Sequence, residues 1–153
     1  MSDSDSTSDL TVHLGYWLRF VSNHVSQAFA RKVEARGVTV AEWVLLRLLY
    51  DVDRLAPNRA AALMGATRGT VSKLADRLLG KSLIHREADP DDGRAQILSL
   101  TALGRRLVPE LAALADANDA EFFHDLAPDD RAALHRILRS IVDRRGLSAV
   151  PVE

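Results

Sequence analysis

The sequence of 153 residues contains no cysteine, and only 5% of its residues are aromatic. Without thiols the chain can form no disulfide scaffold, Cys-ligated zinc site, iron–sulfur cluster or thiol-based redox switch. Charged residues interrupt every hydrophobic segment, so none approaches the roughly 18 to 20 apolar residues of a membrane-spanning helix. Residues 1–9 have neither the basic start nor the apolar centre of a secretory signal. We therefore expect one cytoplasmic domain without membrane contact, preceded by a disordered tail over residues 1–9.

The net charge is also small, because 20 basic residues face 21 acidic ones and leave a balance of -1. This balance argues against a protein that is basic throughout. The charges are unevenly distributed, however. Residues 1–53 hold 5 basic and 7 acidic groups, residues 54–106 hold 10 and 5, and residues 107–153 hold 5 and 9. The middle third is thus the part of the chain whose charge suits a nucleic-acid partner, although a chance cluster of surface arginines is the alternative.

Prolines and glycines are scarce, at five and eight, and the segments between them show mostly helical periodicity. We expect helices over residues 10–36, 41–51, 58–64, 68–80, 102–124 and from 128 onward. Two extended segments, 83–88 and 95–100, flank a cluster with strong turn chemistry at 89–93. The predicted fold class is mainly α with a small β-hairpin.

The third and fourth helices form a helix-turn-helix, because a short turn at Gly65-Ala66 separates them and Thr67 can cap the second one. A β-hairpin that directly follows such a motif is a wing. The order of elements therefore predicts a winged helix-turn-helix, in which the helix over 68–80 would read DNA.

One face of this recognition helix is apolar, and the opposite face carries side chains that suit a major groove. The candidate DNA-binding residues on it are Arg68, Gly69, Thr70, Ser72, Lys73 and Arg77. Asp76 shares that side and would repel phosphate, so we expect it to pair with a neighbouring cation or to face away. The alternative is an ordinary amphipathic helix with a polar exterior.

Arg94 follows Gly93 at the tip of the predicted wing, where it could enter a narrow minor groove. Three aspartates lie in the same loop. We expect Asp92 to support the wing by clamping the Arg94 guanidinium and the other two to serve the turn. A hairpin with a surface ion pair of little energetic value would have the same spacing.

Several segments within residues 57–106 carry a more specific signal. They are residues 61–65, 67–74, 77–78 and 83–86, then the wing sequence Asp89-Pro90-Asp91-Asp92-Gly93-Arg94, and finally Leu100-Thr101 with Gly104. Together these segments resemble the MarR family of bacterial transcription regulators. This chain differs from the family pattern at Gly93, where the family often has a bulky or basic residue, and at Ser82, where a glycine is usual.

The resemblance implies an intertwined helical homodimer in which the first and last helices of two chains interleave. It also implies that the recognition helix enters the major groove, that the wing arginine enters the minor groove, and that a small ligand commonly releases the DNA. We therefore assign residues 10–53 and 107–153 to dimerisation and residues 54–106 to DNA binding.

Aromatic residues are concentrated on the first two helices. Trp17, Phe20 and His24 lie on one stripe, and Trp43 and Arg47 lie on another. A pocket between the stripes would suit a planar aromatic or phenolic acid, which could stack its ring and pair its carboxylate with the arginine. The alternative is that the stripes pack against each other or against a partner subunit.

Enzymatic and metal functions have little support in the sequence. It lacks a glycine-rich phosphate loop and the common hydrolase motifs, and we interpret Glu34, Glu42 and Glu110 as solvated or capping groups. His13 and His24 share a helix face but lie roughly 16 Å apart, too far to bind one ion. We expect a non-enzymatic regulator without cofactor or metal, acting as a dimer on an inverted-repeat operator, most simply as a repressor. The alternatives are a winged-helix module that binds protein and a metal-responsive regulator.

Overall fold

The computed structural model describes residues 6–148 and 151. Its elements are a 3₁₀ turn at Leu10–Val12, the helices α1 (Leu14–Glu34), α2 (Val40–Tyr50), α3 (Pro57–Met64), α4 (Arg68–Gly80), α5 (Ala102–Phe123) and α6 (Pro128–Arg145), and the strands β1 (Ile84–Ala88) and β2 (Gln96–Leu100). The predicted class, mainly helical with one β-hairpin, is confirmed.

Three threonines start helices as the sequence predicts. The Oγ atom of Thr39 accepts a hydrogen bond from the Glu42 amide at 3.2 Å, and Thr67 and Thr101 cap α4 and α5 in the same way. Just after the C-terminal end of α1, Gly37 has a φ of +83°, a conformation that costs glycine little. These local signals explain why most helix boundaries fall within a residue or two of the prediction.

The first helix is shorter than the predicted 10–36. His13 has an extended backbone, with φ -85° and ψ 125°, and it separates the 3₁₀ turn from α1. Residues 6–9 of the predicted tail are exposed and have no regular structure, whereas residues 1–5 lie outside the described residues. None of the described helices is both long and apolar enough to span a bilayer.

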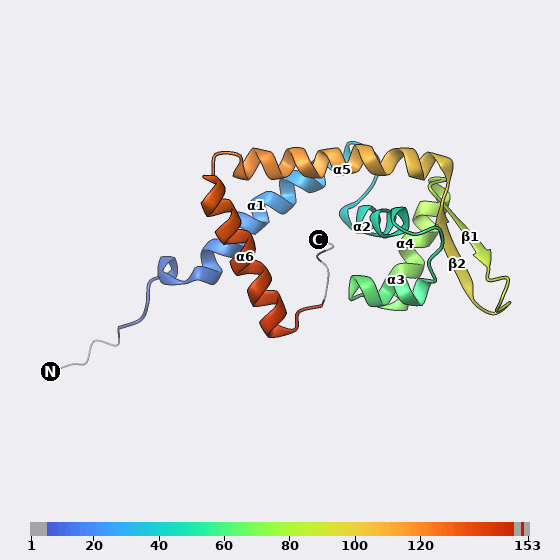
Figure 1. The fold of residues 1–153 in the computed structure, drawn as a ribbon, viewed down its shortest axis with the longest axis horizontal. Coiled ribbons are helices and arrows are strands. Elements are labelled where there is room, and N and C mark those ends of the chain that lie inside the picture. The colour runs from blue at the N-terminus through green and yellow to red at the C-terminus, as the bar shows by residue number, and fades with distance from the viewer. Residues whose placement is uncertain (1–5, 149–150, 152–153) are drawn as a thin grey trace.

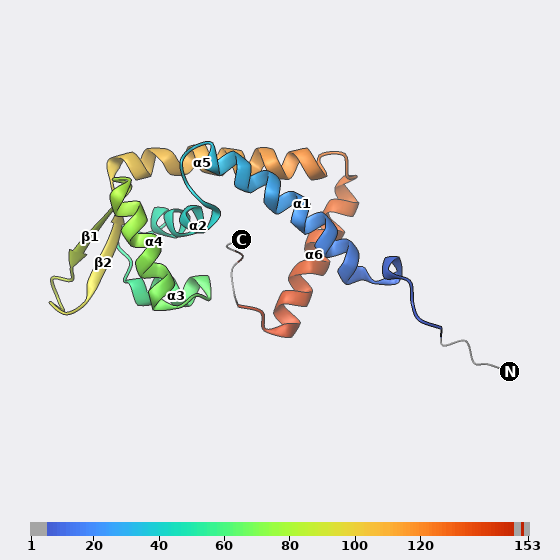
Figure 2. The same ribbon diagram turned by 180° about the vertical axis from the view of Figure 1, so that it is seen from behind.

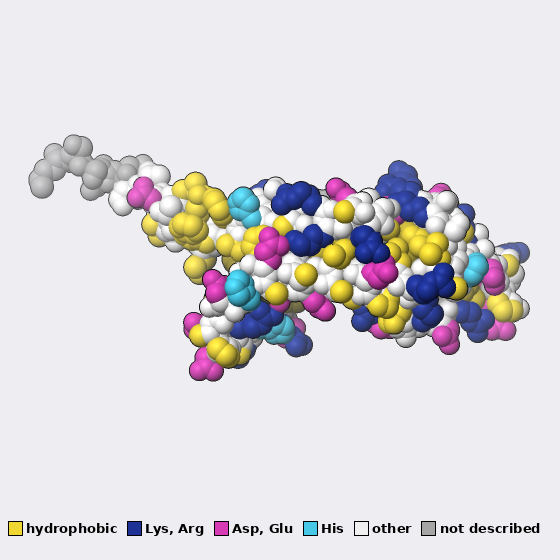
Figure 3. All heavy atoms as spheres, turned by 90° about the horizontal axis from the view of Figure 1, so that it is seen from above, with side chains coloured by type: hydrophobic (Ala, Val, Ile, Leu, Met, Phe, Trp, Pro, Cys, Tyr) yellow, Lys and Arg dark blue, Asp and Glu magenta, His cyan; other side chains and the backbone are white. Residues whose placement is uncertain are grey.

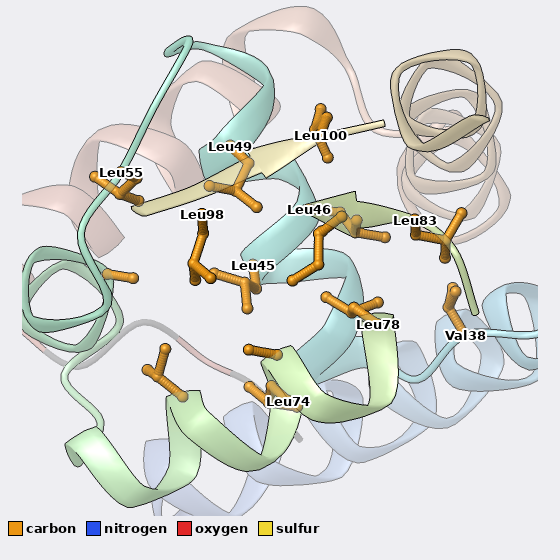
Figure 4. Packing of buried hydrophobic residues seen from close by; sticks show 14 of the residues in the cluster. Val38, Leu45, Leu46, Leu49, Leu55, Leu74, Leu78, Leu83, Leu98 and Leu100 are labelled. Atoms are coloured by element: carbon orange, nitrogen blue, oxygen red, sulfur yellow. The ribbon is translucent and has the colours of Figure 1, made fainter. Parts of the chain in front are cut away.

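Helix α5 runs along the length of the molecule and connects its two ends (Figure 1). Below one end of α5 lie α2, α3, α4 and the hairpin, while α1 crosses α5 and α6 descends from the other end (Figures 1 and 2). The hydrophobic core lies under the first end, where Leu45 and Leu49 of α2 meet Leu74 and Leu78 of α4 (Figure 4). Residues of α2 therefore pack with the helix-turn-helix as well as with α1.

The hairpin is an antiparallel pair in which Ile84 lies opposite Leu100 and Ala88 lies opposite Gln96. A third segment joins it, because the amides and carbonyls of Leu55 and Leu98 exchange hydrogen bonds at 2.8 and 2.9 Å. The bridge fastens the loop before α3 to the wing, so the helix-turn-helix and the wing are held as one unit.

Large apolar side chains are exposed at the opposite end of the molecule. Figure 3 shows them gathered over the start of the chain and α1. They are Leu10, Val12, Leu14, Trp17, Leu18, Phe20 and Val21, and α6 adds Leu134, Ile137, Leu138 and Val142. No residue of α6 is buried within the described part of this chain.

Candidate DNA-binding surface and effector cavity

The polar face of α4 is formed as the periodicity predicts. Val71, Leu74, Ala75 and Leu78 are buried in the core. The candidate residues Arg68, Gly69, Thr70, Ser72, Lys73 and Arg77 are all exposed on the other side. A Cβ atom on Gly69 would have its nearest neighbour at 3.9 Å, the Thr67 hydroxyl, so this position is open to an approaching backbone.

One of these candidates already has a role in the cap. The Thr70 hydroxyl lies 3.0 Å from the Thr67 hydroxyl, which accepts the hydrogen bond from the Thr70 amide. Thr70 therefore stabilises the start of α4, and part of the hydrogen-bonding capacity of its hydroxyl is used within the cap.

Asp76 is neutralised by a neighbour, which confirms the prediction for this residue. Its Oδ1 atom accepts a hydrogen bond from the Arg86 guanidinium at 2.8 Å. Since Arg86 belongs to β1, this ion pair also connects the recognition helix to the base of the wing. The acidic residue thus contributes little repulsion on a face that is otherwise basic.

The wing loop differs from the prediction in what Asp92 binds. Its Oδ1 atom accepts a hydrogen bond from the backbone amide of Arg94 at 3.1 Å, and the described residues contain no ion pair between the two side chains. Asp89 accepts from the amide of Asp91 in the same manner. The predicted guanidinium clamp is therefore wrong. The short side chain of Asp92, at the start of a turn, reaches the backbone amide two residues later more easily than it reaches the guanidinium at the end of the long Arg94 side chain. The Arg94 side chain stays exposed beside Gly93.

Arg94 and the start of α4 face a common groove of about 330 Å³. Arg68 and Ser72 line it from α4, Arg94 and Gln96 from the wing, and Asn58 from the first turn of α3. Neither Arg68 nor Arg94 forms an ion pair with a described residue. The structure thus brings together two arginines that the sequence placed in separate motifs. Asn58 and Gln96 were not predicted: Asn58 is brought to the wing by the packing of distant segments, including the Leu55–Leu98 bridge, and Gln96 belongs to no motif although it is two residues from Arg94.

The aromatic stripe of α1 forms a surface cluster. The Trp17 and Phe20 ring centroids are 6.4 Å apart, and those of Phe20 and His24 are 5.1 Å apart. The Trp17 indole donates to the carbonyl of Thr11 at 2.8 Å, which fixes the 3₁₀ turn against α1. Among the described residues the cluster is exposed, and Trp17, Phe20 and His24 do not line the cavity that Trp43 of the second stripe lines.

A different cavity, of about 320 Å³, lies between α1, α2 and α5. Its apolar lining is Val25, Phe29, Val40, Trp43, Val44, Ala115 and Pro151, and its polar lining is Ser26, Asn118 and Asp119. Of the five candidate effector residues, only Trp43 lines it. The Phe29 and Trp43 rings meet edge to face at 6.4 Å and form one aromatic wall.

Arg47 points to other partners. Its guanidinium contacts Asp51 at 2.7 Å and lies over the ring of Tyr50, at 5.6 Å from the centroid. Arg105 of α5 contacts the same ring at 5.5 Å. Arg47 therefore belongs to a contact between α2 and α5 that is separate from the cavity.

The polar wall of the cavity is formed by a buried amide. Asn118 donates from Nδ2 to the carbonyl of Val25 at 3.1 Å and accepts at Oδ1 from the Lys32 ammonium at 2.9 Å. Lys32 also pairs with Glu121 at 2.6 Å. This network joins α1 to α5 beside the cavity, and it leaves one N–H of the amide without a protein acceptor among the described residues.

Glu42 is not the solvated or capping group that the sequence predicted. Its amide is the group that Thr39 caps, but its carboxylate is only 1% exposed and lies 2.6 Å from the ammonium of Lys81. The spacing of Thr39 and Glu42 indicates a helix cap but does not indicate this pairing, because Lys81 is distant in the sequence. Among the described residues no group of three or more His, Asp or Glu side chains could hold a metal ion.

The comparisons with known proteins agree with this geometry. Residues 36–95 match the model of the MarR family. This segment, which spans α2, the helix-turn-helix and the first strand of the wing, is that of the MarR family of winged helix-turn-helix transcription regulators. The chain is 24% identical over 113 residues to the transcriptional regulator HosA of Escherichia coli O111:H-. The aligned residues cover 72% of this chain and 82% of HosA.

Two solved MarR-like structures superpose over most of the chain. One is from a study of how 6-hydroxynicotinic acid regulates DNA binding by BpsR of Bordetella bronchiseptica, with a TM-score of 0.79, 25% identity, and coverage of 90% of this chain and 99% of BpsR. The other is the complex of MepR from S. aureus with DNA, with a TM-score of 0.78, 25% identity, and coverage of 86% and 98%. MarR-family transcriptional regulators are not enzymes, so these matches agree with the predicted class, a non-enzymatic DNA-binding transcriptional regulator.

Proposed function

We propose that this regulator is a homodimeric repressor of an inverted-repeat operator. Helix α4 of each protomer would enter a major groove, and the wing Arg94 would enter the adjacent minor groove. The two recognition helices would lie about 34 Å apart, one turn of B-DNA. The observation that carries the proposal is the groove that Arg68 and Arg94 share.

The groove has the position that a DNA strand requires. The sugar-phosphate backbone separates each major groove from the next minor groove, so it passes between an element inserted in one and an element inserted in the other. Between α4 and the wing it would meet Arg68 and Arg94 as cations and Asn58, Ser72 and Gln96 as neutral donors. Lys73 and Arg77 would remain on α4 for base edges or further phosphates.

Dimerisation follows from the exposed apolar residues of α1 and α6. A helix with no buried residue does not pack stably by itself, and α6 presents Ile137, Leu138 and Val142 in one stripe. A second copy would cover this stripe and the aromatic cluster of α1. Residues 10–37 and 107–148 would then supply the dimer contacts, and residues 38–106 the DNA-binding unit.

The effector would be a small planar aromatic or phenolic molecule bound in the cavity between α1, α2 and α5. Its ring would lie against Phe29 and Trp43, and its polar groups would meet Ser26 and the free N–H of Asn118. BpsR, for which regulation by an aromatic acid is described, is similar in fold. Binding would release DNA by favouring a different placement of the two recognition helices.

DNA binding is tested with a labelled fragment from upstream of the regulator's own gene, over a series of salt concentrations. We expect binding that weakens steeply as salt rises, since counterions are released from each contacted phosphate. No binding, or binding without salt dependence, would contradict the proposal.

The effector is tested by tryptophan fluorescence in a Trp17→Phe variant, which retains Trp43 as the single tryptophan. Phenol and 6-hydroxynicotinic acid serve as probes, and a saturable change that parallels DNA release is the expected result. A flat response to both would count against this class of effector.

The two alternatives have less support. A winged helix that binds only protein would not need two unpaired arginines in one groove, and a metal-responsive regulator would need ligand clusters that the described residues lack.

A further inference from the structure

A buried ion pair joins the recognition helix to the helix that lines the cavity. Glu42 of α2 is 1% exposed, and its Oε2 atom lies 2.6 Å from the Nζ atom of Lys81, the residue that ends α4. The same Nζ atom donates to the carbonyl of Gly37 at 2.9 Å. Lys81 thus holds together the end of α4, helix α2 and the turn between α1 and α2.

Stability alone is a poor explanation for this pair. Removing a carboxylate from water is costly, and well-packed apolar side chains in place of a buried pair are often as stable or more so. The other carboxylate oxygen, Oε1, is buried without a hydrogen-bond partner among the described residues, which adds to the cost. What the pair supplies and apolar packing does not is a short, charge-assisted hydrogen bond between two specific positions of the two helices.

The position of the pair gives this contact a consequence for DNA binding. Helix α4 has 13 residues and is therefore about 20 Å long. Arg68 lies at its first residue and Lys81 follows its last, so a small change of angle at Lys81 displaces the DNA-facing end. On α2, Trp43 and Val44 follow Glu42 directly and line the cavity. Helix α2 therefore lies between the cavity and the recognition helix.

We propose that Glu42, acting through Lys81, is a positioning residue that sets the angle of α4 against the wall of the effector cavity. It contacts no DNA. The proposal rests on the proposed role of α4 in reading the operator. It extends that role by naming the contact through which α2 controls the orientation of α4.

The sign of one substitution separates positioning from plain electrostatics. Glu42→Gln removes a negative charge, so long-range electrostatics alone would strengthen DNA binding. Positioning predicts the opposite, a dissociation constant raised roughly 3- to 30-fold, the range expected for residues that modulate coupling between sites. Lys81→Met should weaken binding by a similar factor without changing the slope of affinity against salt, because all phosphate-binding side chains are still present. The double variant Glu42→Gln, Lys81→Met should bind DNA no more weakly than the single variant with the lower affinity. Lys81→Arg keeps the positive charge and should retain most of the native affinity.

The chain offers a matched control in Lys32 and Glu121, which are also 2.6 Å apart but join α1 to α5. Glu121→Gln removes the same charge as Glu42→Gln from a side chain that is 55% exposed, and it should leave DNA affinity within about twofold, since surface pairs contribute little. Thermal unfolding of each variant identifies any that fails to fold. If Glu42→Gln does not fold, the double variant Glu42→Leu, Lys81→Met decides, because it leaves no buried charge unpaired and does not change the net charge: weaker DNA binding supports positioning, and native affinity overturns it.

Unchanged affinity in both Glu42→Gln and Lys81→Met would overturn the inference, and so would tighter binding by Glu42→Gln. A second measurement needs no DNA: amide hydrogen exchange at the C-terminal turn of α4 should become faster in Lys81→Met and stay the same in Glu121→Gln. If the native regulator failed to bind the DNA fragment, the proposed function would fail. Unchanged exchange in Lys81→Met would separately overturn the positioning role.

Discussion

The carbonyl oxygen of Leu83 lies 2.1 Å from the point where a Cβ atom on Gly104 would sit. The carbonyl carbon is 3.1 Å from the same point, so the obstacle is backbone that no side-chain rotation can clear. The Thr101 amide donates to this carbonyl at 3.1 Å, which fixes the strand entering the wing against the start of α5. The close approach explains why the position three residues after Thr101 is glycine.

Gly104→Ala should therefore destabilise the regulator by about 3 kcal/mol or more, as expected for a clash with backbone in a packed core. Chemical denaturation measures this change. Gly93→Ala is the matched control, because no atom lies within 4 Å of its Cβ position, and its free energy of unfolding should stay within about 0.5 kcal/mol or rise slightly. Equal changes in the free energy of unfolding for the two substitutions would show that the contact with Leu83 does not determine the cost of Gly104→Ala.

Ser82 has a φ of +60°, the one described non-glycine residue with a positive φ. This conformation costs about 1 kcal/mol for a residue with a Cβ atom, and glycine is the residue usual here in the family. Ser82→Gly should raise the free energy of unfolding by up to about 1 kcal/mol, partly offset by the flexibility of glycine in the unfolded chain. Ser82→Ala, which keeps the strain, should bring no gain. A loss of stability in Ser82→Gly would contradict this account.

Local signals explain why so much of the DNA-binding unit could be predicted from the sequence. Threonine caps, glycines at helix ends and the apolar period of α4 act within one or two helical turns, so spacing alone reports them. The face of α2 was harder to assign. Leu45, Leu46 and Leu49 are buried in the core, whereas Val44 and Leu48, which have the same apolar character, are only half-buried. A helix with apolar residues on several sides gives a weak directional signal.

The wrong predictions share a different cause. The partner of Glu42 is Lys81 and the cavity lies between α1, α2 and α5 because of how distant segments pack, which no local pattern records. For the same reason the sequence does not report that the aromatic stripe of α1 is exposed in this chain, and its part in effector binding stays a prediction. Sequence reasoning found the concentration of aromatic residues but not the surfaces that they face.

The role of Asp92 can be tested by an isosteric change. Since its Oδ1 atom accepts from the Arg94 amide, Asp92→Asn keeps the acceptor and should bind DNA within about threefold of the native affinity. Asp92→Ala removes the acceptor, loosens the wing loop and should weaken binding more. If Asp92 instead clamped the Arg94 guanidinium, Asp92→Asn would weaken DNA binding as much as Asp92→Ala. Fluorescence anisotropy with the labelled fragment distinguishes the two.

The cations of the proposed interface make a prediction about salt. Lys73→Ala and Arg94→Ala should each weaken DNA binding and reduce the slope of log affinity against log salt by about 1 for every phosphate that the side chain neutralised. Arg31→Ala, an exposed cation on α1, should change neither quantity. If Arg94→Ala binds with the native affinity and slope, the wing contributes no contact of the proposed kind.

The proposed dimer depends on the apolar stripe of α6. Ile137 is 48% exposed in the isolated chain, and in a dimer it would be covered by the second copy. Ile137→Asp would bury an unpaired charge in that interface, a change that costs several kcal/mol and should shift the molecule to monomer at micromolar concentration. Arg136→Asp, the neighbouring position on the polar side of α6, also adds an acidic group and should leave the dimer intact. Analytical ultracentrifugation gives the masses, and a native chain that sediments as a monomer at all concentrations would contradict the dimer.

Because each protomer of a dimer would contribute one recognition helix, Ile137→Asp should also lose most of its affinity for a two-half-site operator while its binding to a single half-site is unchanged.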